Sequence, residues 1–199
     1  MVDAGDTVRD VAQRWPGVTE VRLIGSRARG AATALSDWDF VLEAADLEEL
    51  MAALPRLVEP LDPLAAQWDR LSEGALFMLV LPGGEKIDLF PDGRRRAVEP
   101  PWRPGPDTLA GIDAHLWDWL VWLGSKVLRG EDGLVADELA KLHHHLLGPL
   151  GADRPARSVG DAASRYLALR DTAEARYGVA VDRRLGDVVL GRLRDEGVV

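Results

Sequence analysis

The pattern of the sequence changes abruptly after residue 90, and this change constrains the fold more than any other feature. Residues 91–107, PDGRRRAVEPPWRPGPD, contain five prolines, a composition typical of a linker or a surface loop. Strand and helix patterns alternate before this segment, and only helix patterns follow it. We therefore predict an α+β fold, a mixed sheet with flanking helices followed by a helical bundle. The two domains are expected at residues 1–98 and 99–199.

Local patterns define the elements of the first part. The predicted helices cover residues 7–15 and 46–57, and the predicted strands cover 18–25, 36–43 and the two arms of a hairpin within 75–90. Asp46 is expected to cap the second helix, because Glu49 stands at the capping-box position. The hairpin is expected to be antiparallel, because Pro-Gly-Gly-Glu separates its two apolar runs.

The second part reads as helices throughout. Apolar residues recur at helical spacing over residues 108–130, 134–150, 158–178 and 182–197. Trp117, Trp119 and Trp122 lie on the first of these helices, and we expect at least two of them to pack in a core rather than stack on a ligand. The run His143–His145 is expected at a surface or interface, because consecutive helical residues point about 100° apart and cannot all ligate one ion.

Composition excludes several classes of protein. The chain has no cysteine, so disulfides and cysteine-ligated zinc are excluded. Residues 1–15 lack the basic head and apolar stretch of a signal peptide, and no apolar run approaches the ~18 residues of a membrane span. We expect a cytoplasmic protein without a membrane partner. A net charge of −9 suits a cationic small substrate better than a nucleic acid, although acidity also serves solubility alone.

Two closely spaced aspartates interrupt the predicted strand SDWDFVLE (36–43). Asp37 and Asp39 should point to the same side, because side chains alternate along a strand. Asp88 lies in a second strand, KIDLF (86–90), where aspartate is disfavoured. If the strands are neighbours, three carboxylates converge and need cations. Oxygen ligands of this kind hold Mg²⁺, and two such ions can assist an in-line displacement at phosphorus. A simple ion pair between Asp88 and Lys86 is the alternative.

The segment before these aspartates has the features of a phosphate site. Gly25 ends a predicted strand and allows close backbone approach to a ligand. Ser26 can begin a helix whose N–H groups face an anion. Arg27 or Arg29 can add charge-assisted hydrogen bonds to phosphate, or can be solvated. Neither Gly-Lys-Ser/Thr nor G-x-G-x-x-G is present, so a P-loop and a dinucleotide fold are not expected.

Three segments together resemble the DNA polymerase β-like nucleotidyltransferase superfamily: LIGSRARG (23–30), SDWDFVL (36–42) and KIDLF (86–90). The resemblance covers roughly the first half of the chain. It implies that Gly25 and Ser26 bind the phosphates of a nucleotide, and that Asp37 and Asp39 hold two Mg²⁺ ions. Asp88 is then a metal ligand or the general base.

The second half is similar to the helical part of small antibiotic nucleotidyltransferases, which adenylylate aminoglycosides or lincosamides. The segment WLGSKVLRG (122–130) resembles a helix of the aminoglycoside enzymes in which a lysine reaches the nucleotide phosphates, a role that Lys126 would inherit. Some of those enzymes carry a glutamate base one turn earlier, where this chain has Trp122. This departure moves the expected base to Asp88. Asp118 is a weaker candidate for contact with a substrate amine.

These features predict a magnesium-dependent nucleotidyltransferase. It would move a nucleoside monophosphate, with ATP or another NTP as donor, to a hydroxyl of a small-molecule acceptor bound between the domains, such as an aminoglycoside-like antibiotic. No nucleic-acid partner is expected, and the arginine run at 93–96 is interpreted as a solvated loop. Two alternatives remain open. One is a minimal nucleotidyltransferase that modifies a protein, as in toxin–antitoxin systems, and the other is a non-catalytic nucleotide-binding module.

Overall fold

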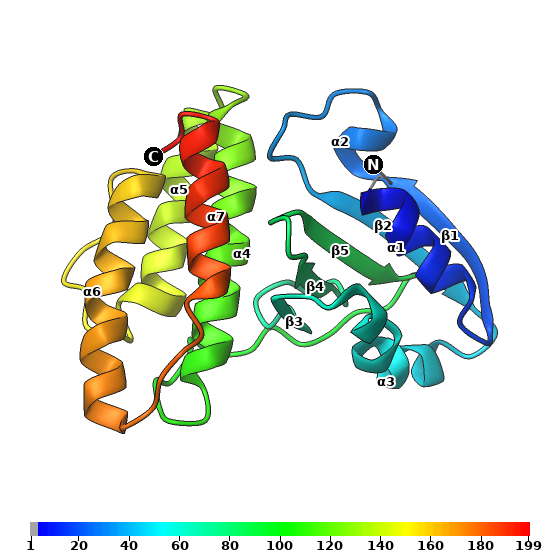
Figure 1. The fold of residues 1–199 in the computed structure, drawn as a ribbon, viewed down its shortest axis with the longest axis horizontal. Coiled ribbons are helices and arrows are strands. Elements are labelled where there is room, and N and C mark those ends of the chain that lie inside the picture. The colour runs from blue at the N-terminus through cyan, green and yellow to red at the C-terminus, as the bar shows by residue number, and fades with distance from the viewer. Residues whose placement is uncertain (1–3) are drawn as a thin grey trace. The chain divides into compact units, whose positions relative to one another are not determined.

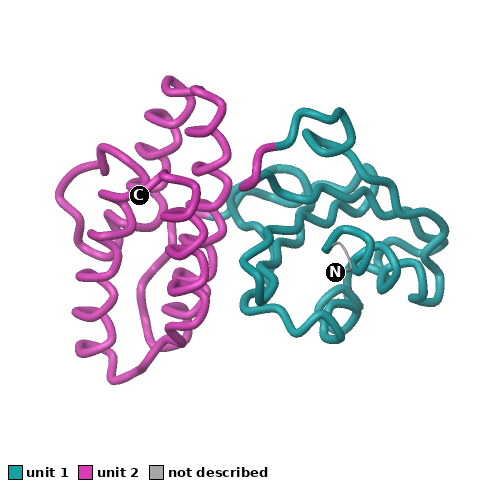
Figure 2. The backbone as a smooth tube through the Cα atoms, turned by 45° about the horizontal axis from the view of Figure 1, so that its top comes forward, with its two compact units in different colours: residues 1–32, 36–99 teal, residues 33–35, 100–199 magenta. Residues whose placement is uncertain are grey.

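The computed structural model describes residues 4–199, and its chain divides into two compact units. The first contains the residues up to Ala32 and Ser36–Glu99, and the second contains Thr33–Leu35 and Pro100–Val199 (Figure 2). Residues 1–3, which begin the segment where no signal peptide is expected, lie outside the described residues. The first unit holds a mixed sheet and the second holds helices (Figure 1), so the predicted α+β fold is confirmed.

The sheet of the first unit has five strands in the order β1-β2-β5-β4-β3. Their bounds are β1 Val18–Ile24, β2 Trp38–Ala44, β3 Ala65–Trp68, β4 Phe77–Val80 and β5 Lys86–Pro91. The strands β4 and β5 form the predicted antiparallel hairpin, whereas β2 and β5 pair in parallel. Strand β3 was not predicted, because four residues are too few to show an alternating pattern.

Three helices and a 3-10 turn accompany the sheet: α1 Ala4–Gln13, α2 Gly25–Ala28, α3 Leu47–Leu57 and η1 Glu59–Leu61. The side chain of Asp46 accepts a hydrogen bond from the Glu49 backbone N–H at 3.0 Å. The predicted cap of this helix is therefore confirmed.

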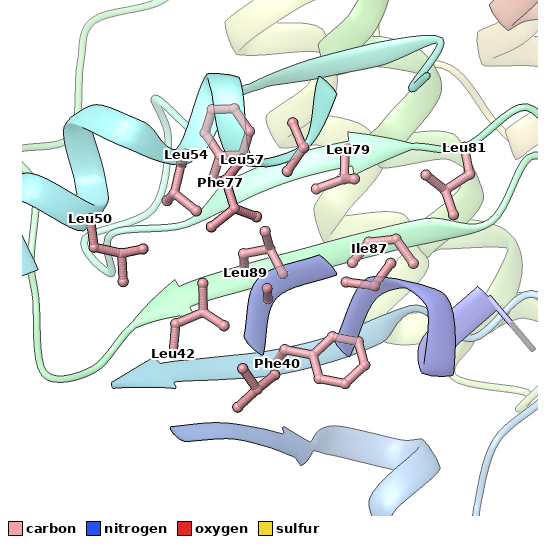
Figure 3. Close-up of a cluster of buried hydrophobic side chains, with 14 residues drawn as sticks. Phe40, Leu42, Leu50, Leu54, Leu57, Phe77, Leu79, Leu81, Ile87 and Leu89 are labelled. Carbon is pink, nitrogen blue, oxygen red and sulfur yellow. The ribbon is translucent and has the colours of Figure 1, made fainter. Parts of the chain in front are cut away.

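The core of the first unit lies on one face of the sheet, against α1 and α3 (Figure 3). It is lined by Phe40 and Leu42 of β2, Phe77 and Leu79 of β4, Ile87 and Leu89 of β5, and Leu50, Leu54 and Leu57 of α3. Because side chains alternate along a strand, burial of Phe40 and Leu89 directs Asp39 and Asp88 to the opposite face. The apolar core thereby orients the acidic side chains.

The second unit consists of α4 Leu109–Val127, α5 Asp132–Leu142, the π-helical turn η2 His143–Leu147, α6 Val159–Tyr177 and α7 Arg184–Asp195. The helix predicted at 134–150 is divided, because the Gly148 N–H donates to the His143 carbonyl, five residues back, at 2.7 Å. Among residues 4–199, no helix is long and apolar enough to cross a membrane.

A buried polar network ties α4 to α6. The Asp113 carboxylate accepts hydrogen bonds from Trp117 Nε1 at 3.0 Å and from the Tyr166 hydroxyl at 2.6 Å. Arg170 Nη1 lies 3.6 Å from the same oxygen. Burial raises the pKa of Asp113, while its hydrogen bonds act in the opposite direction. Trp117 is fully buried beside Tyr166, as predicted for a packing tryptophan.

The Tyr166 hydroxyl should contribute to stability through this network. We expect Tyr166→Phe to lower the free energy of unfolding by about 1–3 kcal/mol, because a buried carboxylate loses a donor. Tyr177→Phe, at the half-buried end of the same helix, is the matched control and should change it by less than about 0.5 kcal/mol. Denaturant unfolding followed by tryptophan fluorescence measures both, and equal midpoints for the two variants would contradict the role of the network.

Candidate active site

The parallel pairing of β2 and β5 brings three acidic residues together. Asp39 stands directly opposite Asp88 in the register, and Asp37 immediately precedes β2. One carboxylate oxygen of each residue lies within 4.8 Å of the others. Asp37 and Asp88 are buried, with 8% and 5% of their surface exposed, and Asp39 is half-buried. Carboxylates this close repel one another, so the cluster favours a bound cation.

Lys86 supplies one positive charge to this cluster. Its ammonium pairs with Asp88 Oδ1, and both side chains are buried. Burial raises the pKa of Asp88, Lys86 acts in the opposite direction, and Asp37 raises it further. Asp88 is therefore both a member of the carboxylate cluster and the ion-pair partner of Lys86, so both interpretations of this residue apply. Lys86 was not predicted to belong to the site, although its position on the same strand face as Asp88 indicates that it does.

Gly25 lies against the carboxylate of Asp39. The register of β1 and β2 pairs Ile24 with Asp39, and α2 begins at the next residue. Gly25 has a φ of +69°, and a Cβ built on it would lie 1.9 Å from Asp39 Oδ2. Only glycine therefore fits here, both for its backbone conformation and for the close approach of the carboxylate.

Ser26 follows with a buried hydroxyl. Its side chain is 5% exposed, and its Oγ has no hydrogen-bond partner within residues 4–199. Buried hydroxyls normally have a partner, so this atom is suited to a ligand oxygen. The helix expected to begin at Ser26 begins one residue earlier, at Gly25, and Ile24 is its N-cap.

The two arginines of this segment have different environments. Arg27 Nε and Nη2 donate to the Ser36 carbonyl at 3.1 and 2.7 Å, and Nε also donates to the Asp37 carbonyl at 3.0 Å. Its guanidinium lies 4.0 Å from the centre of the Trp38 ring. Arg27 thus holds the backbone that leads into Asp37. Arg29 is exposed at the C-terminal cap of α2, and its phosphate role stays a prediction.

The other candidate residues lie elsewhere in the chain. Lys126 and Asp118 are on α4, in the second unit, and Lys126 Nζ lies 4.8 Å from the centre of the Trp122 ring. Asp118 is buried. Contact of Lys126 and Asp118 with a substrate stays a prediction.

The residues of the cluster fit a divalent cation. Asp37, Asp39 and Asp88 offer carboxylate oxygens only, the donor type that Mg²⁺ prefers. The close approach of Gly25 leaves backbone, rather than a side chain, beside Asp39.

The contact between Gly25 and Asp39 gives a direct test. Gly25→Ala should weaken Mn²⁺ binding by at least about tenfold, because the new Cβ would displace the Asp39 carboxylate. A loss of this size is typical when the contacts that orient a metal ligand are disturbed. Gly30→Ala is the matched control, because Gly30 has the same backbone conformation, φ +68°, and a Cβ built on it would meet no atom within 4 Å. Both variants should lose about 1–2 kcal/mol of stability from the strained backbone. Equal Mn²⁺ affinities of the two variants, measured by titration, would contradict a metal role for Asp39.

One segment of the first unit is similar to a known protein family. Residues 6–66 match the family model of the nucleotidyltransferase domain. The matched segment runs from α1 into β3 and includes Gly25, Ser26, Asp37 and Asp39, and it ends before Asp88. None of the curated proteins matches the chain.

Several solved structures are similar, all with a TM-score of 0.40. An aminoglycoside 6-adenyltransferase from Bacillus subtilis is 10% identical, with 98% of this chain and 99% of that chain covered. A cytoplasmic RNA terminal U-transferase is 18% identical (74% and 49% covered), and the polymerase core of TRAMP, an RNA surveillance complex, is 16% identical (96% and 54%). The chain thus spans about half the length of these two. Likenesses this weak do not identify an acceptor, and the family model matches residues 6–66 alone.

Proposed function

We propose that this protein is a magnesium-dependent nucleotidyltransferase that moves AMP from ATP, or another nucleoside monophosphate from its triphosphate, to a hydroxyl of a small molecule. The observation that carries this proposal is the convergence of Asp37, Asp39 and Asp88 within 4.8 Å of one another. It occurs beside Gly25, in a chain whose residues 6–66 match the nucleotidyltransferase domain.

The reaction would be an in-line displacement. The acceptor oxygen forms a bond to the α-phosphorus, the bond from that phosphorus to the bridging oxygen breaks, and pyrophosphate leaves. Asp37 and Asp39 would hold two Mg²⁺ ions, with Asp88 as a further ligand. Bound magnesium lowers the pKa of the attacking hydroxyl and stabilises the negative charge of the leaving group.

Asp88 is the proposed acceptor of the hydroxyl proton. Its burial raises its pKa and so favours the protonated product of that step. The ion pair with Lys86 keeps the carboxylate charged and oriented before the reaction. Asp88 thus combines the two roles that the resemblance implies, metal ligand and base.

The nucleotide phosphates would be held by backbone N–H groups at Gly25 and Ser26, and by the buried Ser26 hydroxyl. Arg29 and Lys126 are the proposed cationic partners of the triphosphate. In this proposal residues 1–98 form the catalytic domain, and residues 99–199 form a helical domain that completes the acceptor site.

Charge favours a small acceptor over a nucleic acid. The chain carries a net charge of −9, whereas binding along the phosphate backbone of a nucleic acid needs an extended basic surface. Two of the three arginines in the run pair with carboxylates, since Arg94 Nη2 lies 3.2 Å from Glu48 and Arg95 pairs with Glu73. Arg96 lies 4.7 Å from the centre of the Trp68 ring. A cationic, hydroxylated compound such as an aminoglycoside fits this balance of charge.

The carboxylates should be needed for nucleotide binding but not for folding. Asp37→Asn combined with Asp39→Asn should abolish magnesium-dependent ATP binding in calorimetry. The same change should leave the melting temperature equal or raise it, because it removes repulsion between neighbouring charges. Asp92→Asn, an exposed aspartate just after β5, is the control and should bind as the wild type does. ATP binding that survives the double substitution, or that persists in EDTA, would contradict the metal site.

The acceptor can be identified by mass. Wild-type protein with Mg²⁺ and each NTP is incubated with a panel of aminoglycosides and lincosamides, and products are analysed by mass spectrometry. We expect one acceptor to gain one nucleoside monophosphate, with release of pyrophosphate, and Asp88→Asn to remove this product. A blank panel, with transfer to RNA or to a protein in parallel incubations, would overturn the small-molecule acceptor while retaining the transferase activity.

A further inference from the structure

The loop between α2 and β2 is divided between the two compact units. Thr33–Leu35 belong to the helical unit, and Ser36 and Asp37 belong to the sheet unit. Figure 2 shows this short segment in the colour of the helices. The loop therefore connects a segment of the helical unit along the backbone to the first carboxylate of the cluster.

Two contacts anchor the loop in the helical unit. Leu35 is 1% exposed, and a Cβ built on Gly124 of α4 would lie 2.8 Å from Leu35 Cδ1 and 2.6 Å from Leu193 Cδ2. Leu35 therefore occupies the space that glycine leaves on α4, beside α7. One residue earlier, the Ala34 carbonyl accepts a hydrogen bond from Arg192 Nη2 of α7 at 2.8 Å.

The other end of the loop is held by the sheet unit. Arg27 donates to the carbonyls of Ser36 and Asp37, with distances of 2.7 to 3.1 Å. Only Ser36 separates Leu35, seated among helices, from Asp37, seated in the carboxylate cluster. The freedom of Asp37 is thus restricted from both directions along the backbone.

Asp37 depends on these anchors more than its neighbours do. Asp39 and Asp88 lie within strands, where the ladder of β2 and β5 fixes their backbone. Asp37 precedes the first residue of β2 and lies outside that ladder. The position of the Asp37 carboxylate therefore depends on contacts of the loop.

We infer that Leu35 and Arg192 are positioning residues for Asp37, so that full metal affinity requires the loop to be seated in the helical unit. This inference rests on the proposed function, because it takes Asp37 as a metal ligand.

The test compares Mn²⁺ affinity in the full-length chain, measured by electron paramagnetic resonance of free Mn²⁺. Arg192→Met and Leu35→Ala should each weaken binding by about tenfold, the loss typical of residues that orient metal ligands. Arg194→Met, an exposed arginine on the same helix, is the matched control and should bind as the wild type does. Melting temperatures are recorded for every variant, and binding is measured well below them. If Leu35→Ala does not fold, Arg192→Met decides.

The outcomes separate this inference from the proposed function. Wild-type binding that is lost in the double asparagine variant, but unchanged in Arg192→Met, would overturn the inference and leave the metal site intact. Wild-type protein that binds no Mn²⁺ would overturn the proposed function itself. Excess Mg²⁺ should also restore nucleotidyl transfer in Arg192→Met but not in the double asparagine variant. A change in stability alone would not produce that rescue.

Discussion

The repulsion between three buried or half-buried carboxylates is the constraint on which the candidate site depends. The parallel register of β2 and β5 places Asp39 opposite Asp88. The next residues of these strands, Phe40 and Leu89, point to the other face of the sheet, where they pack in the apolar core. The acidic residues cannot turn away without exposing Phe40 or Leu89. The energy of the apolar core thus holds like charges together, and cations relieve the resulting strain. Lys86 supplies one from within the chain, and magnesium is the proposed source of the rest.

The turn at Gly25 and Ser26 keeps side chains away from one side of the carboxylate cluster. Any side chain at Gly25 would collide with the Asp39 carboxylate, so backbone alone borders the acidic cluster on that side. The Ser26 hydroxyl is buried next to it. A phosphate chain bridging metal ions and N–H groups matches such a surface, which is consistent with the family match of this segment.

Helices and sheet contribute unequally to the three carboxylates. Strand pairing fixes two of them, whereas Asp37 is placed by a loop whose residues Thr33–Leu35 belong to the helical unit. Arg27, expected either to bind phosphate or to be solvated, is engaged instead with the backbone of that loop. The helical unit has a buried polar network around Asp113, which ties α4 to α6. A stable bundle of this kind can serve as an anchor for a catalytic loop.

By itself, the sequence determined the features that depend on neighbours along the chain. Period-two alternation predicted that Asp37 and Asp39 share a side, the Asp46 cap and the β4–β5 hairpin followed from local motifs, and the proline-rich segment predicted the change from sheet to helices. The tertiary structure alone decided that β2 and β5 are neighbours, which places the Lys86–Asp88 ion pair beside Asp37 and Asp39. It also decided that β3 joins the sheet edge and that Leu35 packs against Gly124, 89 positions later in the chain. The physical reason is range: alternation and capping act over a few residues, whereas strand order and loop seating depend on contacts between residues that are distant in the sequence.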